Sequence, residues 1–150
     1  MIGNCVGSRL IRKSKMLLEL FGIAPTIAAV AQLARAALVH QLCAWANWRR
    51  PAGTLLQLCV RDVAGQPIYV RGGTSDLETL HATFVRGYHL PPADLVGIRT
   101  ILDLGSNIGL TVAHYANLYP YARVLGIEMD ADNVQLCRRN IAKYTDHCQI

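Results

Sequence analysis

The sequence lacks the cysteine patterns of a metal site or a disulfide scaffold. It contains no C-x-x-C pair, and no cysteines and histidines stand at the spacing of zinc ligands. Its five cysteines are an odd number, scattered along the chain at Cys5, Cys43, Cys59, Cys137 and Cys148. We therefore expect free thiols in a reducing compartment, a cytoplasmic location and no bound metal.

Charged residues are also scarce. They make up 17% of the sequence against 52% hydrophobic residues, which argues against a disordered chain. The net charge of +5 comes from the first fifty residues, which hold seven Lys or Arg and one acid, Glu19. The remaining hundred residues hold eight basic and nine acidic residues. A nucleic-acid-binding domain gathers its basic residues on the folded surface, so this distribution argues against nucleic acid as a partner.

The N-terminal fifty residues combine a basic stretch, Arg9 to Lys15, with a long apolar stretch. The run from Leu20 to Ala34 has fifteen residues, fewer than the roughly 20 that span a bilayer. We favour helices broken at Pro25, forming a basic and apolar extension over residues 1–50. Membrane association through residues 9–48 and a cleaved signal peptide are the two alternatives.

The stretch Arg49 to Gly53 contains proline and glycine and predicts a linker, so we place a domain boundary near residue 50. A strand-like run from Leu55 then leads through the turn residues Ala64 and Gly65 to Pro67–Arg71. This pattern predicts a β-hairpin.

A helix is expected after the hairpin. Ser75 and Glu78 have the spacing of a capping box, in which each side chain binds a backbone N–H of the first turn. Gly87 is expected to end the helix. The polar residues Thr74, Ser75 and Asp76 follow two glycines, and they either cap this helix or form a lid over a ligand site.

The clearest pattern lies between residues 100 and 141. An apolar strand, Thr100–Leu104, runs into a glycine turn, and an apolar helix follows that stops near Pro120. A second strand, Arg123–Ile127, ends on Glu128, and Asp130 can cap the next helix. The order strand, helix, strand, helix predicts a parallel βαβ unit.

The turn suggests which ligand this unit binds. Gly105 and Gly109 allow a tight turn and close approach of a ligand, and the following helix offers free N–H groups to a negative charge. Glu128 stands where an acid can bind both hydroxyls of a ribose. A dinucleotide site favours G-x-G-x-x-G, whereas here an acid, Asp103, precedes the first glycine and Asn107 replaces the second. Asp103 would repel a pyrophosphate and suits a cationic amino-acid tail, which favours S-adenosylmethionine over NAD.

At these residues the sequence resembles a known family. Asp103–Gly109 and Gly126–Asp130 resemble the first two motifs of the class I S-adenosylmethionine-dependent methyltransferases. Together with Arg71–Asp76 and Asn140–Ile141, they are similar more narrowly to the FkbM family. The resemblance covers residues 54–150.

The resemblance implies an α/β, Rossmann-like fold, S-adenosylmethionine as cofactor, and O-methylation of a sugar or natural-product hydroxyl. The acceptor would then be a small molecule or a glycan. The sequence departs from the family pattern at Gly73, where Pro-Gly is expected before Thr-Ser-Asp, and at Met129, where Pro is expected after Glu. Met129 can instead offer an apolar contact to adenine. Carried over residue by residue, the cofactor-binding set is Asp103, Gly105, Ser106, Asn107, Gly109, Glu128 and Met129.

Cys148–Ile150 reads as the start of a third strand. A class I domain has further strands, which commonly supply acceptor and catalytic groups, so we expect an incomplete fold that holds the cofactor-binding half. An inactive remnant and a different nucleotide-binding module are the alternative functions. No catalytic residue is assigned, since the histidines that could accept a proton are expected to be packing or surface residues: His81, His89, His114 and His147.

Overall fold

The computed structural model describes residues 14–16, 18–24, 28–32, 34–35, 38 and 54–150. These residues form a mixed α/β structure with a two-stranded hairpin and a small parallel sheet of three strands. The parallel sheet with its helices is compatible with part of a Rossmann-like fold. The linker expected at residues 49–53 lies outside the described residues.

The predicted β-hairpin is confirmed. Strands β1 (Leu55–Cys59) and β2 (Pro67–Arg71) pair antiparallel, and the short 3-10 helix η1 (Arg61–Val63) lies in their connection. Ala64 and Gly65 both adopt positive φ angles, of 54° and 70°, and turn the chain back. Leu58 of β1 and Ile68 and Val70 of β2 are fully buried, as is Val60 directly after β1.

Helix α3 (Asp76–Phe84) follows the hairpin and ends before Gly87, as predicted. The prediction of a capping box was wrong. The Ser75 side chain makes no capping hydrogen bond, and Thr74 Oγ1 instead accepts from the Asp76 N–H at 3.2 Å. Glu78 therefore does not complete a capping box, and its Oε2 is buried without a hydrogen-bond partner among the described residues.

The βαβ prediction is also confirmed. Strand β3 (Thr100–Leu104), helix α4 (Leu110–Leu118) and strand β4 (Arg123–Ile127) follow in order, and β3 and β4 pair parallel. Helix α5 (Ala131–Asn140) is capped by Asp130, whose side chain accepts from the Asn133 N–H at 2.8 Å. A second 3-10 helix, η2 (Ala142–Tyr144), leads to β5 (Cys148–Gln149), which adds to β4 in parallel.

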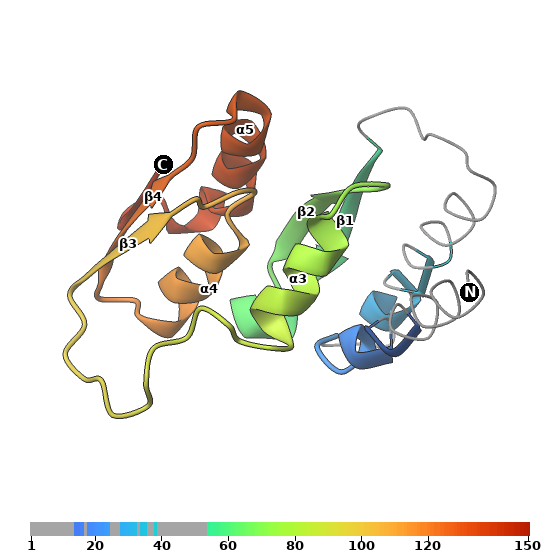
Figure 1. Cartoon of the computed structure of the whole chain (residues 1–150), viewed down its shortest axis with the longest axis horizontal. Helices are drawn as coiled ribbons and strands as arrows, with labels where there is room; N and C mark the ends of the chain where they lie inside the picture. Colours follow the sequence, from blue (N-terminus) through green and yellow to red (C-terminus); the bar gives the residue numbers. More distant parts are fainter. Residues whose placement is uncertain (1–13, 17, 25–27, 33, 36–37, 39–53) are drawn as a thin grey trace, which may run out of the picture.

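The elements form layers, as Figure 1 shows: α4 and α5 lie between the parallel sheet and the layer of hairpin and α3. Val124 and Gly126 of β4 are buried toward these helices, while the alternate residues of the strands point the other way. That second face of the sheet exposes aliphatic side chains, namely Leu102, Leu104, Leu125 and Ile127. The core therefore lies on one side of the parallel sheet.

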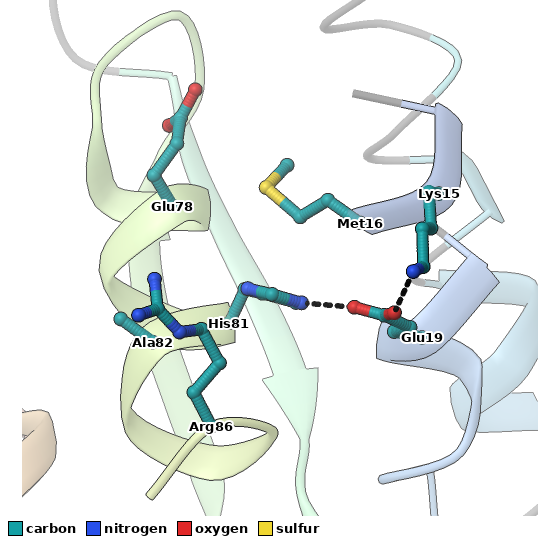
Figure 2. Close-up of a pocket in the computed structure, with 7 residues that line it drawn as sticks. All are labelled: Lys15, Met16, Glu19, Glu78, His81, Ala82 and Arg86. Atoms are coloured by element: carbon teal, nitrogen blue, oxygen red, sulfur yellow. Dashed lines mark hydrogen bonds and ion pairs between the residues drawn. The ribbon is translucent and has the colours of Figure 1, made fainter. Parts of the chain in front are cut away.

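The described part of the N-terminal extension is helical at residues 14–16, 18–21, 28–32, 34–35 and 38. It packs against the hairpin layer: Leu20 is 1% exposed, and the Ile23 carbonyl accepts from the Arg61 N–H at 2.9 Å. Glu19 Oε2 lies 2.7 Å from His81 Nε2 on α3, as Figure 2 shows. The extension thus contributes side chains to the same core.

No helix within the described residues has the length and apolar character needed to cross a bilayer. Association of residues 9–48 with a membrane stays an untested alternative. Cys59, Cys137 and Cys148 are free thiols in this part of the chain, and Cys5 and Cys43 lie outside it.

Candidate functional site

A cavity of about 330 Å³ lies between α3 and the glycine turn that follows β3. One wall comes from α3 and the residue Tyr88, and the other from the turn and the first residues of α4. Its lining consists of Ser75, Glu78, Thr79, Ala82, Tyr88, Gly105, Ser106, Asn107, Leu110 and Thr111. The volume falls within the range of small-molecule sites, about 300–1,000 Å³.

A larger cavity of about 420 Å³ shares Glu78 and Ala82 with the first and lies between α3 and the N-terminal helix (Figure 2). Its lining comes from α3, from Arg86 just after it, and from Lys15, Met16 and Glu19, and no glycine turn contributes backbone N–H groups. We therefore place the candidate site in the cavity at the turn, where a helix N-terminus and a glycine-containing backbone meet.

The two glycines of the turn have different roles, although their backbones are alike. Gly105 and Gly109 have φ angles of +81° and +80°. A Cβ at Gly105 would have no atom within 4 Å, so the space beside it is open to a ligand. A Cβ at Gly109 would lie 2.4 Å from Cys137 Sγ, so Gly109 permits α4 to pack against α5. The expectation of ligand access therefore fits Gly105 and not Gly109.

A third glycine, Gly126, has a packing role that the sequence did not predict. A Cβ at Gly126 of β4 would lie 2.6 Å from Ser106 Oγ, so the glycine makes room for the turn to lie on the strand. Ser106 is 2% exposed, and its hydroxyl donates to the Asp103 carbonyl at 2.9 Å. These contacts make Ser106 a residue that shapes the turn.

Asp103 and Thr111 lie against each other at the start of α4. The Thr111 hydroxyl donates a hydrogen bond to Asp103 Oδ2. Thr111 lines the cavity and Asp103 does not. The carboxylate thus sits directly behind the cavity wall, where its charge acts on the site through Thr111.

Glu128, at the end of β4, is tied to the turn. Its Oε2 accepts from the Asn107 N–H at 2.8 Å, and its Oε1 accepts from the N–H groups of Met129 and Asp130 at 3.0 and 2.9 Å. The Asp130 N–H is the largest cause of a lowered pKa of Glu128, to which the N–H groups of Asn107 and Met129 add. Glu128 is therefore an anion at neutral pH, and of its roughly four lone-pair sites one remains to accept a further hydrogen bond. Met129 is 97% exposed.

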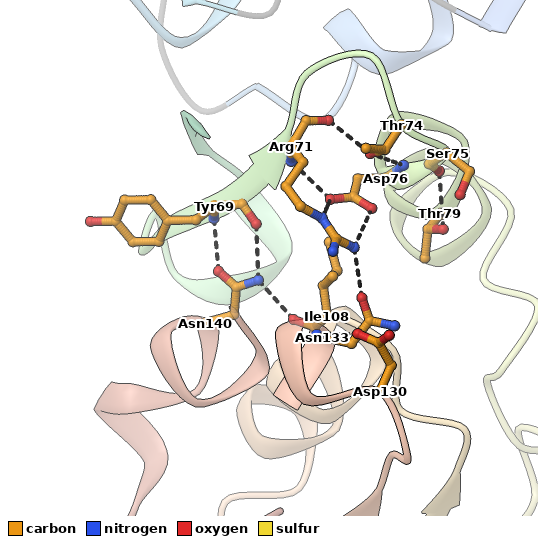
Figure 3. Close-up of polar contacts among 10 residues, drawn as sticks. All are labelled: Tyr69, Arg71, Thr74, Ser75, Asp76, Thr79, Ile108, Asp130, Asn133 and Asn140. Atoms are coloured by element: carbon orange, nitrogen blue, oxygen red, sulfur yellow. Dashed lines mark hydrogen bonds and ion pairs between the residues drawn. The ribbon is translucent and has the colours of Figure 1, made fainter. Parts of the chain in front are cut away.

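The residues considered as a lid, Thr74, Ser75 and Asp76, separate into two groups (Figure 3). Ser75 is exposed and lines the cavity. Asp76 is 2% exposed, and its carboxylate binds Arg71 through Nε at 2.9 Å and Nη2 at 3.0 Å. Arg71 Nη2 also donates to Asn133 Oδ1 on α5 at 2.7 Å. Asp76 thus holds the turn to α5, and only Ser75 faces the candidate site.

Tyr88 and Glu78 also line the cavity, although the sequence did not propose either as a ligand-binding residue. Tyr88 lines the cavity from the segment after α3. Glu78 lines it from α3 itself, and its buried Oε2 has no hydrogen-bond partner in the described chain. An unpaired carboxylate oxygen is costly unless a donor or cation reaches it. The only signal for Glu78 was its acidity, and the sequence assigned that to a capping box.

The histidines do not gather in the cavity. His89 Nε2 and His114 Nδ1 lie 3.0 Å apart, and the His114 ring packs against Phe84. Burial, together with the neighbouring His89, lowers the pKa of His114 to about 4. His81 pairs with Glu19 at the larger cavity. In the described chain, none of these side chains lines the cavity at the turn.

Comparison with known proteins adds no family to these observations. No protein-family model matches the chain, and no curated protein matches it.

Proposed function

We propose that this chain carries the cofactor-binding part of a class I S-adenosylmethionine-dependent methyltransferase of the FkbM type. The proposed reaction is O-methylation of a hydroxyl on a small molecule or glycan. One observation carries the proposal: the Gly105–Asn107 turn lines a cavity, and the acid that follows the next strand, Glu128, binds this turn from outside the cavity lining. This arrangement suits a ligand with a polar tail and a ribose.

The cavity fits the amino-acid tail of S-adenosylmethionine on two counts. The open space beside Gly105 admits a ligand against the backbone, and the N-terminus of α4 offers N–H groups and a positive dipole end to a carboxylate. Glu78 on the facing wall suits an ammonium group, since its Oε2 has no hydrogen-bond partner among the described residues. A zwitterionic tail between the two walls would satisfy both.

Glu128 suits the ribose because its carboxylate can accept a further hydrogen bond. A carboxylate has about four lone-pair sites, and the three backbone N–H groups leave room for a further donor. The N–H groups also hold the carboxylate in one orientation, so little freedom is lost when a hydroxyl binds. Exposed Met129 stands next in the chain, where its side chain can cover an apolar ring.

S-adenosylmethionine would supply the methyl group from its sulfonium centre to the acceptor oxygen, with cleavage of the S–C bond and release of S-adenosylhomocysteine. The residues of this chain bind and orient the cofactor, and orientation is a major source of rate enhancement in such displacements. No residue of the described chain is assigned as the base that takes the acceptor proton.

Calorimetric titration of the full chain with S-adenosylmethionine, and in parallel with NAD, tests the proposal. We expect saturable one-to-one binding of S-adenosylmethionine and of its demethylated product, S-adenosylhomocysteine. NAD should show no binding at the same concentrations. Tight NAD binding, or no binding of either adenosyl compound by the folded chain, would refute the assignment.

A further inference from the structure

We propose that Asn140 is a positioning residue that holds together the two walls of the candidate site. Its side-chain amide binds both the hairpin that leads into α3 and the glycine turn before α4. The inference rests on the proposed function for its ligand, but the geometry can be tested without one.

Asn140 is the last residue of α5 and is 4% exposed. Figure 3 shows its amide between the hairpin and the turn. Its Oδ1 accepts from the Tyr69 N–H at 2.7 Å, and its Nδ2 donates to the Tyr69 carbonyl at 3.0 Å. Nδ2 also donates to the Ile108 carbonyl at 2.8 Å. Each donor of the amide thus has its own carbonyl.

The Ile108 carbonyl lies at a sensitive point of the turn. Ile108 stands between two residues with positive φ angles, Asn107 at 49° and Gly109 at 80°. Such a backbone is costly for a residue other than glycine and persists where its surroundings fix it. The hydrogen bond from Asn140 fixes the peptide group between the two unusual positions.

The Tyr69 contacts extend this effect to the opposite wall. Tyr69 lies on β2, and β2 leads through Arg71 and the turn at Thr74 into α3, whose residues line the cavity. One amide therefore sets the spacing between the glycine turn and the layer that carries α3. A change at Asn140 should alter the cavity without touching any residue that lines it.

Asn140→Asp is the most informative variant. It keeps the acceptor for the Tyr69 N–H, removes both donors, and places a carboxylate oxygen near two carbonyl oxygens. Arg139→Gln is the matched control. Arg139 is the preceding residue of α5 and also contacts Tyr69, with its guanidinium carbon 3.8 Å from the ring centre, but none of its described contacts reaches the turn.

The first readout needs no ligand. In amide NMR spectra of the full chain, Asn140→Asp should shift the signals of Gly105, Asn107 and Gly109, and Arg139→Gln should leave them in place. Lowering the pH until the introduced carboxyl is protonated returns one donor and should move the signals back toward those of the wild type. Unchanged turn signals in folded Asn140→Asp, or equal shifts in Arg139→Gln, would overturn the inference.

The second readout is affinity for S-adenosylmethionine. We expect Asn140→Asp to weaken binding by about tenfold or more, as the loss of a buried hydrogen bond would, and Arg139→Gln to have little effect. If the wild type binds no S-adenosylmethionine, the proposed function fails while the NMR test still stands. If Asn140→Asp does not fold, the wild type decides: the Asn140 side-chain amide protons should be strongly protected from exchange with solvent. Exchange as fast as that of an exposed asparagine would then contradict the inference.

Discussion

The backbone N–H of Asn107 donates a hydrogen bond to Glu128 Oε2 across 2.8 Å and so joins the glycine turn to the end of the neighbouring strand. Asn107 has a φ angle of 49°, in the left-handed region, which aims this N–H at the acid. The same carboxylate is the proposed ribose ligand. Glu128 therefore has two roles, since it fixes the shape of the turn and also offers charge to the ligand.

Glu128→Ala should weaken binding of S-adenosylmethionine by about 1.5–3 kcal/mol, the range for a hydrogen bond to a charged group. Glu128→Gln separates the two roles in part, because its single carbonyl oxygen can still accept either the Asn107 N–H or those of Met129 and Asp130, while the negative charge is lost. We expect Gln to retain the thermal midpoint of the wild type more closely than Ala does, yet to bind more weakly than Glu. Calorimetry and thermal unfolding of all three proteins provide the comparison. Unchanged affinity in a folded Glu128→Ala protein would remove Glu128 from the site.

Gly105→Ala and Gly109→Ala form a matched pair, because both glycines have a φ angle near +80° and share the same backbone strain, about 1–2 kcal/mol for a residue with a Cβ. At Gly105 the new methyl group enters open space, so ligand binding should suffer more than stability. At Gly109 it meets Cys137 Sγ at 2.4 Å, so stability should fall further. Urea unfolding and titration with S-adenosylmethionine distinguish the two. Equal losses of stability would show that α5 yields easily at Cys137.

The elements of the fold were predictable because their signals are local. The glycines at the turn, Asp130 as a cap and the Ala64–Gly65 reversal each act within a few residues, and the structure has them where the sequence placed them. The role of Gly109 was not predictable. Position 109 has no room for a side chain because Cys137, which is distant in sequence, packs against it.

The candidate site was only partly predictable for the same reason. Asn140 contacts Tyr69 across 71 positions of sequence, and no local pattern signals such a contact. Asp76 looked available to a ligand, yet Arg71 holds its carboxylate. Glu78 looked like half of a capping box, but the Thr74 hydroxyl took the place of Ser75 at the helix start. Where the local sequence allows a side chain more than one role, contacts with residues distant in sequence decide which role it takes.

Arg71→Leu should destabilise the chain by about 3 kcal/mol or more, since removing one partner of a buried ion pair leaves the other charge uncompensated. Asp76 has a side chain only 3% exposed and receives both guanidinium bonds. Arg71→Lys keeps the positive charge but not the paired geometry, so we expect it to lie between Leu and the wild type. Urea unfolding at pH 7 measures the three. If Arg71→Lys matches the wild type, the charge alone suffices and the bidentate contact adds nothing.

His114 should make stability depend on pH below neutrality. Burial holds its folded-state pKa at about 4, whereas its value in an unfolded chain is near 6.5. Between these two values the unfolded chain binds a proton that the folded chain does not, so stability is full above pH 6.5, falls toward pH 4 and then levels off. His114→Gln retains a hydrogen-bonding side chain beside His89 and removes the titration, while His89 and the carboxylates remain in both proteins. On acidification from pH 7 to pH 4.5, the wild type should therefore lose more unfolding free energy than His114→Gln, by on the order of 1–3 kcal/mol. Parallel curves for the two proteins across this range would mean that His114 is protonated without cost in the folded state, and that its contacts with Phe84 and His89 do not exclude the charge.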